Sequence, residues 1–289
     1  MGIGLASLAL HALLAWGLAL QGWVGEPLGV IGCAVSNVTI AWLSCVTGGA
    51  YLALGPLGRR YRPLAGWAAP DARRWRELLR LGLPMGLSHL IEITSFTLVS
   101  LFIAPLGATV VAGHRIIANV SALTYMLPLA LAIATMAAVG QAVGGRDWPR
   151  ARAVITAGLL IAGLLSALVG VVLWFAAAPL IAAYTDDPAI RAVAGSLVVY
   201  IALYQFFDAL QTVAGHALRA YRIAFVPMLV QTFCFWGIGL LGGSWLCYRW
   251  SPPLGVAGFW LAAVISLVLA AVLLLPLLRQ AMRASESAP

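Results

Sequence analysis

Hydrophobic positions along the chain form long runs that alternate with short polar turns. A helix needs roughly 20 apolar residues to cross a bilayer. Eight segments reach about that length, at residues 4–21, 28–54, 78–106, 116–143, 154–177, 192–218, 225–246 and 254–278. Turn signals such as Gly25-Glu26-Pro27 and Ser251-Pro252-Pro253 separate them. The pattern predicts an all-α integral membrane protein with about eight transmembrane helices.

The composition excludes the soluble classes of protein. Of the 289 residues, 63% are hydrophobic and 9% are charged, and the mean hydropathy is +0.99, whereas soluble domains contain about 25% charged residues. The net charge of +8 does not indicate nucleic-acid binding, because too little polar surface remains for a basic groove. The four cysteines lie in or beside apolar runs without a CxxC motif, which predicts neither a metal site nor redox chemistry. They are Cys33, Cys45, Cys234 and Cys247.

The arginines predict the orientation of the helices. All 17 basic residues are arginines, and 14 of them lie in connections that the eight-helix count places on one side of the membrane. These are Arg59, Arg60, Arg62, Arg73, Arg74, Arg76, Arg80, Arg146, Arg150, Arg152, Arg219, Arg222, Arg279 and Arg283. Only Arg115, Arg191 and Arg249 lie on the other side. Because arginine concentrates in cytoplasmic loops, we expect a multi-pass protein of the inner (plasma) membrane with both termini in the cytoplasm.

The longest connection, residues 55–76, is the candidate boundary between two groups of helices. It holds six arginines and three prolines. Near its end, Asp71 precedes the sequence ARRWRELL and is expected to cap a helix there. This piece is predicted to lie along the cytoplasmic interface, with Trp75 at headgroup depth, before the third span begins.

A short repeat predicts an internal duplication. The second span opens with PLGVIG at residues 27–32 and the eighth with PLGVAG at residues 253–258, so five of six residues match. The segment before the second copy has room for about four more helices than the segment before the first. We therefore expect two parallel lobes, an architecture that transporters use, with the first lobe incomplete. The expected divisions are 1–57 (last two helices of the first lobe), 58–77 (cytoplasmic linker), 78–280 (six-helix second lobe) and 281–289 (cytoplasmic tail).

Two acidic residues lie where charges are costly. Glu92 is near the centre of the third span and Asp208 near the centre of the sixth, and a mid-membrane acid costs about 3 kcal/mol on the insertion scale. Tyr204 lies one helical turn before Asp208 on the same face. Glu92, Tyr204 and Asp208 are therefore the predicted binding site. His89 and Glu92 alone are too few ligands for a metal site. The sequence contains neither a nucleophile–base motif nor a P-loop, so it predicts neither an enzyme nor a cofactor.

Two carboxyl groups in one apolar cavity repel each other when both are charged, so a bound cation would neutralise them. A site that cannot hold a proton or Na⁺ together with an organic cation is the physical basis of an antiporter. Aromatic and methionine side chains on the same helices can add cation–π and soft contacts. They are Phe96, Tyr125, Phe206, Phe207, Met85, Met126 and Met136.

The chain resembles the multidrug and toxic compound extrusion (MATE) family, in its NorM-like branch. The resemblance rests on LRLGLPMGLSHLIEITSF, on APLGATVVAGHRIIANVSALTYMLPLALA and on LYQFFDALQTVAGHALRAYR. It implies that the first two spans match the family's fifth and sixth helices and that the rest forms its second lobe. By position, Glu92, Tyr204 and Asp208 match coupling-cation residues, while Asn119 and Pro128 match the eighth helix. Arg115, where a glutamine is usual, and Ala220, where a glycine is usual, depart from the family pattern.

The resemblance implies a cation-coupled (H⁺ or Na⁺) antiporter that exports organic cations and toxic compounds, with no cofactor. It also implies that four further first-lobe helices, or another chain, complete the cavity. One alternative is a lipid-linked oligosaccharide flippase of the same superfamily, which would favour basic cavity residues, and none lies mid-span here. The other alternative is a structural membrane subunit that does not transport anything.

Overall fold

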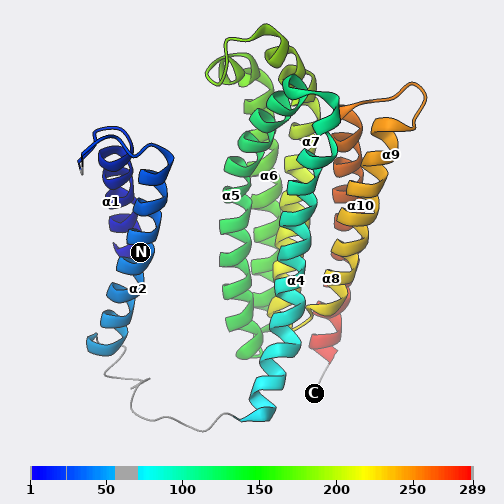
Figure 1. The fold of residues 1–289 in the computed structure, drawn as a ribbon. Helices are drawn as coiled ribbons and strands as arrows, with labels where there is room; N and C mark the ends of the chain where they lie inside the picture. Colours follow the sequence, from blue (N-terminus) through cyan, green and yellow to red (C-terminus); the bar gives the residue numbers. More distant parts are fainter. Residues whose placement is uncertain (1, 24, 56–70, 288–289) are drawn as a thin grey trace. The chain divides into compact units, whose positions relative to one another are not determined.

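The computed structural model describes residues 2–23, 25–55 and 71–287, and within them the regular secondary structure is helical (Figure 1). The chain divides into two compact units, Met1–Asp71 and Ala72–Pro289. Residues 56–70 of the expected linker lie outside the described residues. The predicted all-α class is confirmed in the part of the chain that is described.

The first unit is a helical hairpin of α1 (Gly2–Ala19) and α2 (Val30–Leu54). Polar side chains join the two helices where both are otherwise apolar. Ser36 hydrogen-bonds His11 Nδ1 at 2.9 Å, and the hydroxyl groups of Ser7 and Ser44 lie 3.0 Å apart. Small and hydroxyl-bearing residues are the usual means by which helices associate in an apolar environment.

The second unit contains the remaining helices. They are α4 (Ala72–Phe102), η1 (Ala104–Leu106), α5 (Ala108–Gly144), α6 (Trp148–Ala182), α7 (Pro188–Ala220), α8 (Phe225–Gln231), η2 (Thr232–Gly242), α9 (Gly243–Tyr248) and α10 (Val256–Ser287). Aspartates begin two of them, because a carboxylate satisfies the free N–H groups of a first turn. Asp147 accepts from the Arg150 amide at 3.1 Å, and Asp187 from the Ala189 amide at 2.8 Å.

Helix α7 occupies the centre of this unit, because it packs against α5, α6 and α10. Its buried face carries small side chains, and Ala209, Val213, Ala214 and Ala217 have no exposed surface. Small residues let helix backbones approach closely. The centre of the unit is therefore tightly packed around the helix that carries Asp208.

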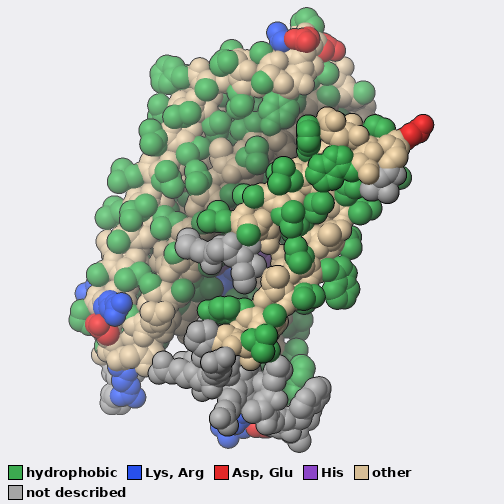
Figure 2. All heavy atoms as spheres, turned by 90° about the vertical axis from the view of Figure 1, so that its left-hand side faces the viewer, with side chains coloured by type: hydrophobic (Ala, Val, Ile, Leu, Met, Phe, Trp, Pro, Cys, Tyr) green, Lys and Arg blue, Asp and Glu red, His purple; other side chains and the backbone are tan. Residues whose placement is uncertain are grey.

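Seven helical segments of the described residues are long and apolar enough to cross a membrane, and Gly4–Ala19 is a shorter apolar helix. Hydrophobic side chains predominate on the face shown in Figure 2, and most of the arginine and acidic side chains in that view lie toward its upper and lower ends. In Figure 1, the start of α4, the α5–α6 and α7–α8 connections and the end of α10 share one end of the second unit. The chain is thus a multi-pass membrane protein.

Two helices differ from the expectation. The piece after Asp71 is continuous with the third span, since α4 runs without interruption from Ala72 to Phe102 with Pro84 inside it. The seventh span is not a uniform α-helix, because η2 is an 11-residue π-helix. Its glycine-rich sequence, TFCFWGIGLLG, favours helix irregularity.

The two copies of the repeat form the same local structure. Gly29 (φ 53°) and Gly255 (φ 57°) have backbone conformations that side chains rarely adopt. The residue before each glycine donates its amide to the preceding helix, Leu28 to the Leu18 carbonyl at 3.1 Å and Leu254 to the Leu246 carbonyl at 3.2 Å. Each copy therefore fixes a tight turn between consecutive helices.

The last glycine of each copy permits a close helix crossing. A Cβ atom on Gly32 would lie 2.8 Å from backbone atoms of Leu18 and Ala19, and one on Gly258 would lie 2.9 Å from those of Leu246 and Cys247. Backbone cannot move aside as a flexible side chain can. The repeat thus encodes a turn followed by a glycine contact in each unit.

Replacing Gly258 by alanine should destabilise the second unit, by about 1–3 kcal/mol, because the added methyl group overpacks a backbone contact. Gly82→Ala is the matched control, since nothing lies within 4 Å of a Cβ atom there. Thermal unfolding in detergent would measure both variants. Equal unfolding midpoints for Gly258→Ala and Gly82→Ala would contradict the close crossing.

Candidate functional site

The predicted site residues come together in the second unit around two adjoining hollows. The larger has a volume of about 330 Å³ and is lined by residues of α4, α5 and α7. The smaller, of about 50 Å³, is lined by α4, α7, η2 and α10. Glu92, Phe96, Tyr204 and Asp208 line both. The sequence prediction that Glu92, Tyr204 and Asp208 share one cavity therefore agrees with this geometry.

Asp208 is the most enclosed member of this set, with 3% of its surface exposed. Its carboxylate Oδ1 accepts a hydrogen bond of 3.0 Å from Gln211 Nε2, one turn further along α7. A buried charged group is destabilising unless the protein supplies hydrogen-bond or ionic partners for it. The α7 helix thus supplies both the carboxyl group and the amide that orients it.

Glu92 projects from α4 and is more accessible, with 24% of its side chain exposed. The Tyr125 hydroxyl, from α5, donates to Glu92 Oε1 at 2.8 Å, and His89 Nδ1 lies 3.4 Å from Oε2. Both carboxylate oxygens therefore have a partner, and one of those partners connects α4 to α5.

Tyr204 lines both hollows. It meets Trp260 of α10 edge-on with ring centroids 5.8 Å apart, and Phe96 meets the same indole at 6.4 Å. The Trp260 Nε1 in turn donates to His114 Nδ1 at 3.2 Å. This aromatic cluster holds the Tyr204 ring against the carboxyl-bearing wall.

Of the aromatic and methionine candidates, Phe96, Tyr125 and Met126 line the larger hollow. Phe206 and Phe207 pack against each other at 5.3 Å. Asn119 accepts a hydrogen bond of 2.8 Å from the Tyr184 hydroxyl. The sequence predicts Tyr125 only as an aromatic contact, whereas the structure shows that its hydroxyl group hydrogen-bonds Glu92. Its position 33 residues from Glu92 gave no local signal of that bond.

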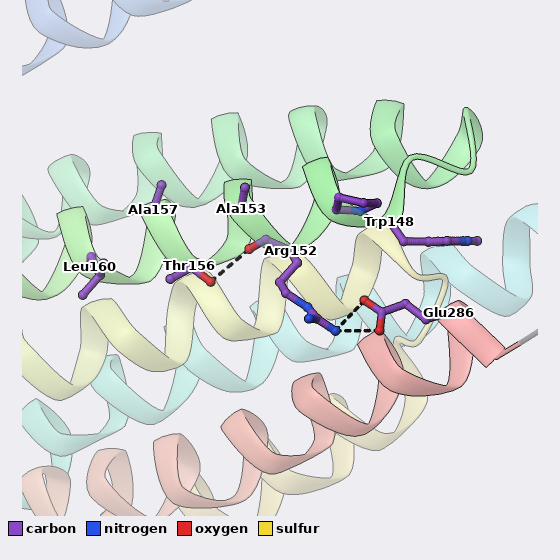
Figure 3. Close-up of a pocket in the computed structure, with 8 residues that line it drawn as sticks. Trp148, Arg152, Ala153, Thr156, Ala157, Leu160 and Glu286 are labelled. Atoms are coloured by element: carbon purple, nitrogen blue, oxygen red, sulfur yellow. Dashed lines mark hydrogen bonds and ion pairs between the residues drawn. The ribbon is translucent and has the colours of Figure 1, made fainter.

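A larger hollow, of about 830 Å³, lies between the start of α6 and the end of α10 (Figure 3). Arg152 Nη2 lies 2.6 Å from each carboxylate oxygen of Glu286, so the two charges neutralise each other. Burial, with the negative charge of Glu286 adding to it, raises the pKa of the nearby Tyr221 above its usual value. The charges that line this hollow thus pair with each other, whereas Glu92 and Asp208 line their hollows without an arginine among the described residues.

The ligands available at that site are mainly oxygen atoms of carboxyl and hydroxyl groups, with the His89 imidazole beside Glu92. Within the described residues, no group of three or more His, Cys, Asp and Glu side chains is arranged to hold a metal ion. Hard, weakly bound cations such as Na⁺, or a proton, suit two carboxylates and tyrosine hydroxyls. The arrangement can therefore bind and release a small cation.

Comparison with known proteins agrees with this architecture. The MatE family model matches residues 84–245. The chain is 48% identical over 281 residues to the probable multidrug resistance protein NorM of Aromatoleum aromaticum, an alignment covering 96% of this chain and 60% of that protein. It is 37% identical to the probable multidrug resistance protein NorM of Chromobacterium violaceum, and that alignment covers 98% of this chain and 61% of that protein. The chain thus spans about 60% of the length of these curated relatives.

Solved structures show the same fold. The eukaryotic MATE transporter AtDTX14 superposes with a TM-score of 0.84 at 19% identity, over 98% of this chain and 63% of that one. A MOP superfamily transporter from Pyrococcus furiosus superposes with a TM-score of 0.83 at 17% identity, over 98% of this chain and 62% of that one. Since the family model covers more than half of the chain, and NorM proteins align along nearly all of it, the protein belongs to the multidrug and toxic compound extrusion (MATE) family.

Proposed function

We propose that this chain forms the cation-binding part of a cation-coupled multidrug antiporter that exports organic cations. The observation that carries the proposal is the pair of carboxyl groups, Glu92 and Asp208, lining shared hollows inside an apolar helix bundle. Tyr204 and Tyr125 supply hydroxyl groups beside them. H⁺ or Na⁺ is the proposed coupling ion, bound at Glu92, Tyr204 and Asp208.

The chemistry of the lining supports exchange between two cations. Neutralising the carboxylates with a small cation removes the attraction for an organic cation, and the reverse also holds. Phe96 and Tyr125 line the same hollow, and aromatic rings can contact a delocalised positive charge. Competition for one negative site then couples the uptake of one ion to the export of the other.

The lining also separates this proposal from the flippase alternative. A pyrophosphate-linked lipid would need cationic side chains, and no arginine is among the described residues that line the two hollows. Two acidic residues favour a positively charged substrate. The names of the relatives, multidrug resistance proteins, support drugs and toxic compounds as that class.

We further propose a location in the bacterial inner (plasma) membrane, with the start of α4 and the end of α10 in the cytoplasm. The support is the arginine distribution, because Arg80, Arg150, Arg222 and Arg279 belong to the arginine-rich end of the second unit. We also propose that residues 78–280 form one six-helix lobe and that residues 1–57 contribute two helices to another.

Replacing Asp208 by asparagine should slow coupled efflux by about ten- to a hundredfold, as expected for loss of a charge-assisted interaction. The variant should fold, because removing a charge from the membrane interior does not raise the cost of insertion. The test is ethidium accumulation in cells that express the protein from its complete native reading frame. Glu92→Gln should lose activity partially, since Asp208 keeps a charge in the cavity.

Asp186→Asn is a control for these carboxyl substitutions, because Asp186 lies in an exposed connection and pairs with Arg191 at 2.8 Å. It should retain efflux. Normal efflux by Asp208→Asn, at equal protein level, would rule out the proposed site.

Tyr204→Phe should impair efflux less than Asp208→Asn, because it removes one hydroxyl group and leaves both carboxyl groups in place. Its ring would keep the contact with Trp260. The same ethidium assay, together with the dependence of efflux on Na⁺ concentration and pH, measures the difference. A Tyr204→Phe defect larger than both carboxyl substitutions would show that the site is placed wrongly.

The proposed orientation predicts which connections react from outside the cell. In a variant whose four native cysteines are replaced, a membrane-impermeant maleimide should label Asp186→Cys in intact cells and Arg150→Cys only after the cells are opened. The reason is that Asp186 lies in the arginine-poor α6–α7 connection and Arg150 at the arginine-rich end. The opposite labelling would reverse the orientation.

A further inference from the structure

A second buried amide lies behind the one that contacts Asp208. Gln231 is the last residue of α8, is 3% exposed, and donates from Nε2 to Gln211 Oε1 at 3.3 Å. Gly215, one turn after Gln211, faces Gln231, and a Cβ atom there would lie 3.9 Å from Gln231 Nε2, an ordinary van der Waals distance. Gln231, Gln211 and Asp208 thus form a chain of hydrogen bonds from α8 to the candidate site.

The hydrogen bonds from Gln231 through Gln211 to Asp208 all run in one direction. Gln211 Nε2 donates both to Asp208 Oδ1 and to Thr212 Oγ1, each at 3.0 Å, while its carbonyl oxygen accepts from Gln231. With the carbonyl oxygen accepting from Gln231, the amide N–H groups face the carboxyl group and Thr212. An N–H donor stabilises a carboxylate, whereas a carbonyl oxygen would instead accept from a protonated carboxyl group.

Packing alone does not account for a glutamine at position 231. Its Oε1 is buried without a hydrogen-bond partner among the described residues, and an unsatisfied buried acceptor is destabilising. An apolar side chain of similar size would avoid that cost. The hydrogen bond to Gln211 is what an apolar replacement would lose.

We propose that Gln231 is a positioning residue that, through its hydrogen bond to the Gln211 carbonyl oxygen, holds the Gln211 amide donor toward the Asp208 carboxyl group. This inference rests on the proposed role of Asp208 as the coupling group. Gln231 does not touch the cation; it acts through Gln211. Gln231 is on α8 and Gln211 is on α7, so the hydrogen bond between them links the Asp208 carboxyl group to the packing of these two helices.

Other ionisable groups also face Asp208 and define the background of any titration. His89 and Glu92 from α4, Tyr125 from α5 and Tyr204 from α7 line the same hollows. His216 and Arg219 lie further along α7, with Arg219 Nη1 3.3 Å from His216 Nε2. The η2 and α10 residues of the lining are not ionisable, and neither α8 nor residues 153–182 of α6 include an acidic or basic residue. None of these groups is changed by a substitution at position 231.

The chain offers a matched control in Gln205. It is 1% exposed, lies on α7 one turn before Asp208, and donates from Nε2 to the Ser121 carbonyl at 3.2 Å and to Thr124 Oγ1, both on α5. Gln205→Leu therefore removes a buried amide near Asp208 without touching the hydrogen-bond chain. Any general loosening of the bundle should appear in Gln205→Leu as well.

The test is an infrared titration of the protein purified from its complete native reading frame. The carbonyl stretch of the protonated Asp208 carboxyl group is identified by its loss in Asp208→Asn. In Gln231→Leu, the pH at half-protonation should move upward by about half a unit to one unit, which is about a three- to tenfold change in proton affinity. Gln205→Leu should titrate like the unmodified protein.

Gln231→Met, which fits irregular apolar gaps, should shift in the same direction and provides a second variant if the leucine protein is unstable. Unshifted titration of the Gln231 variants, or an equal shift in Gln205→Leu, would overturn the inference. The infrared signal reports protonation whether or not transport occurs. Failure of the proposed function would appear separately, as ethidium efflux that survives Asp208→Asn.

Discussion

A carboxyl group inside a membrane has no bulk water to solvate it, so its charge depends on the partners that neighbouring helices supply. Asp208 meets this constraint from a nearly closed position, with an amide donor from its own helix. Glu92 meets it from a more open position, with a tyrosine hydroxyl from α5 and a histidine from its own helix. The two acids are therefore held differently although they line the same hollows.

The tight packing of α7 makes this arrangement possible. Small residues on α7 allow α5 and α6 to approach, and a glycine of α6, Gly170, would place an added Cβ atom 3.2 Å from the Ala202 carbonyl of α7. A helix fixed on several sides cannot easily turn its polar face toward lipid. The Asp208 side chain is consequently oriented by the whole bundle as well as by Gln211.

The sequence was sufficient to predict the helices and the acidic pair, because both follow from local signals. Apolar length predicts a span, and an acid in the middle of such a span is unusual enough to identify Glu92 and Asp208. The bond from Tyr125 to Glu92 and the contact of Gln231 with Gln211 depend on how separate helices pack. Periodicity along one helix carries no information about that packing. The π-helix of η2 likewise arises where glycines and neighbouring helices act together.

The site draws its residues from several helices, which bears on how an ion could change the structure. A ligand shifts a conformational equilibrium only by binding one state better than another. A cation between Glu92 of α4 and Asp208 of α7 would do so, because it replaces repulsion between two carboxylates with attraction to both. Glu92 is tied to α5 through Tyr125, and Asp208 to α8 through Gln211 and Gln231. Neutralising the pair would therefore change the forces on four helices at once, because each carboxyl group is hydrogen-bonded, directly or through Gln211, to a neighbouring helix.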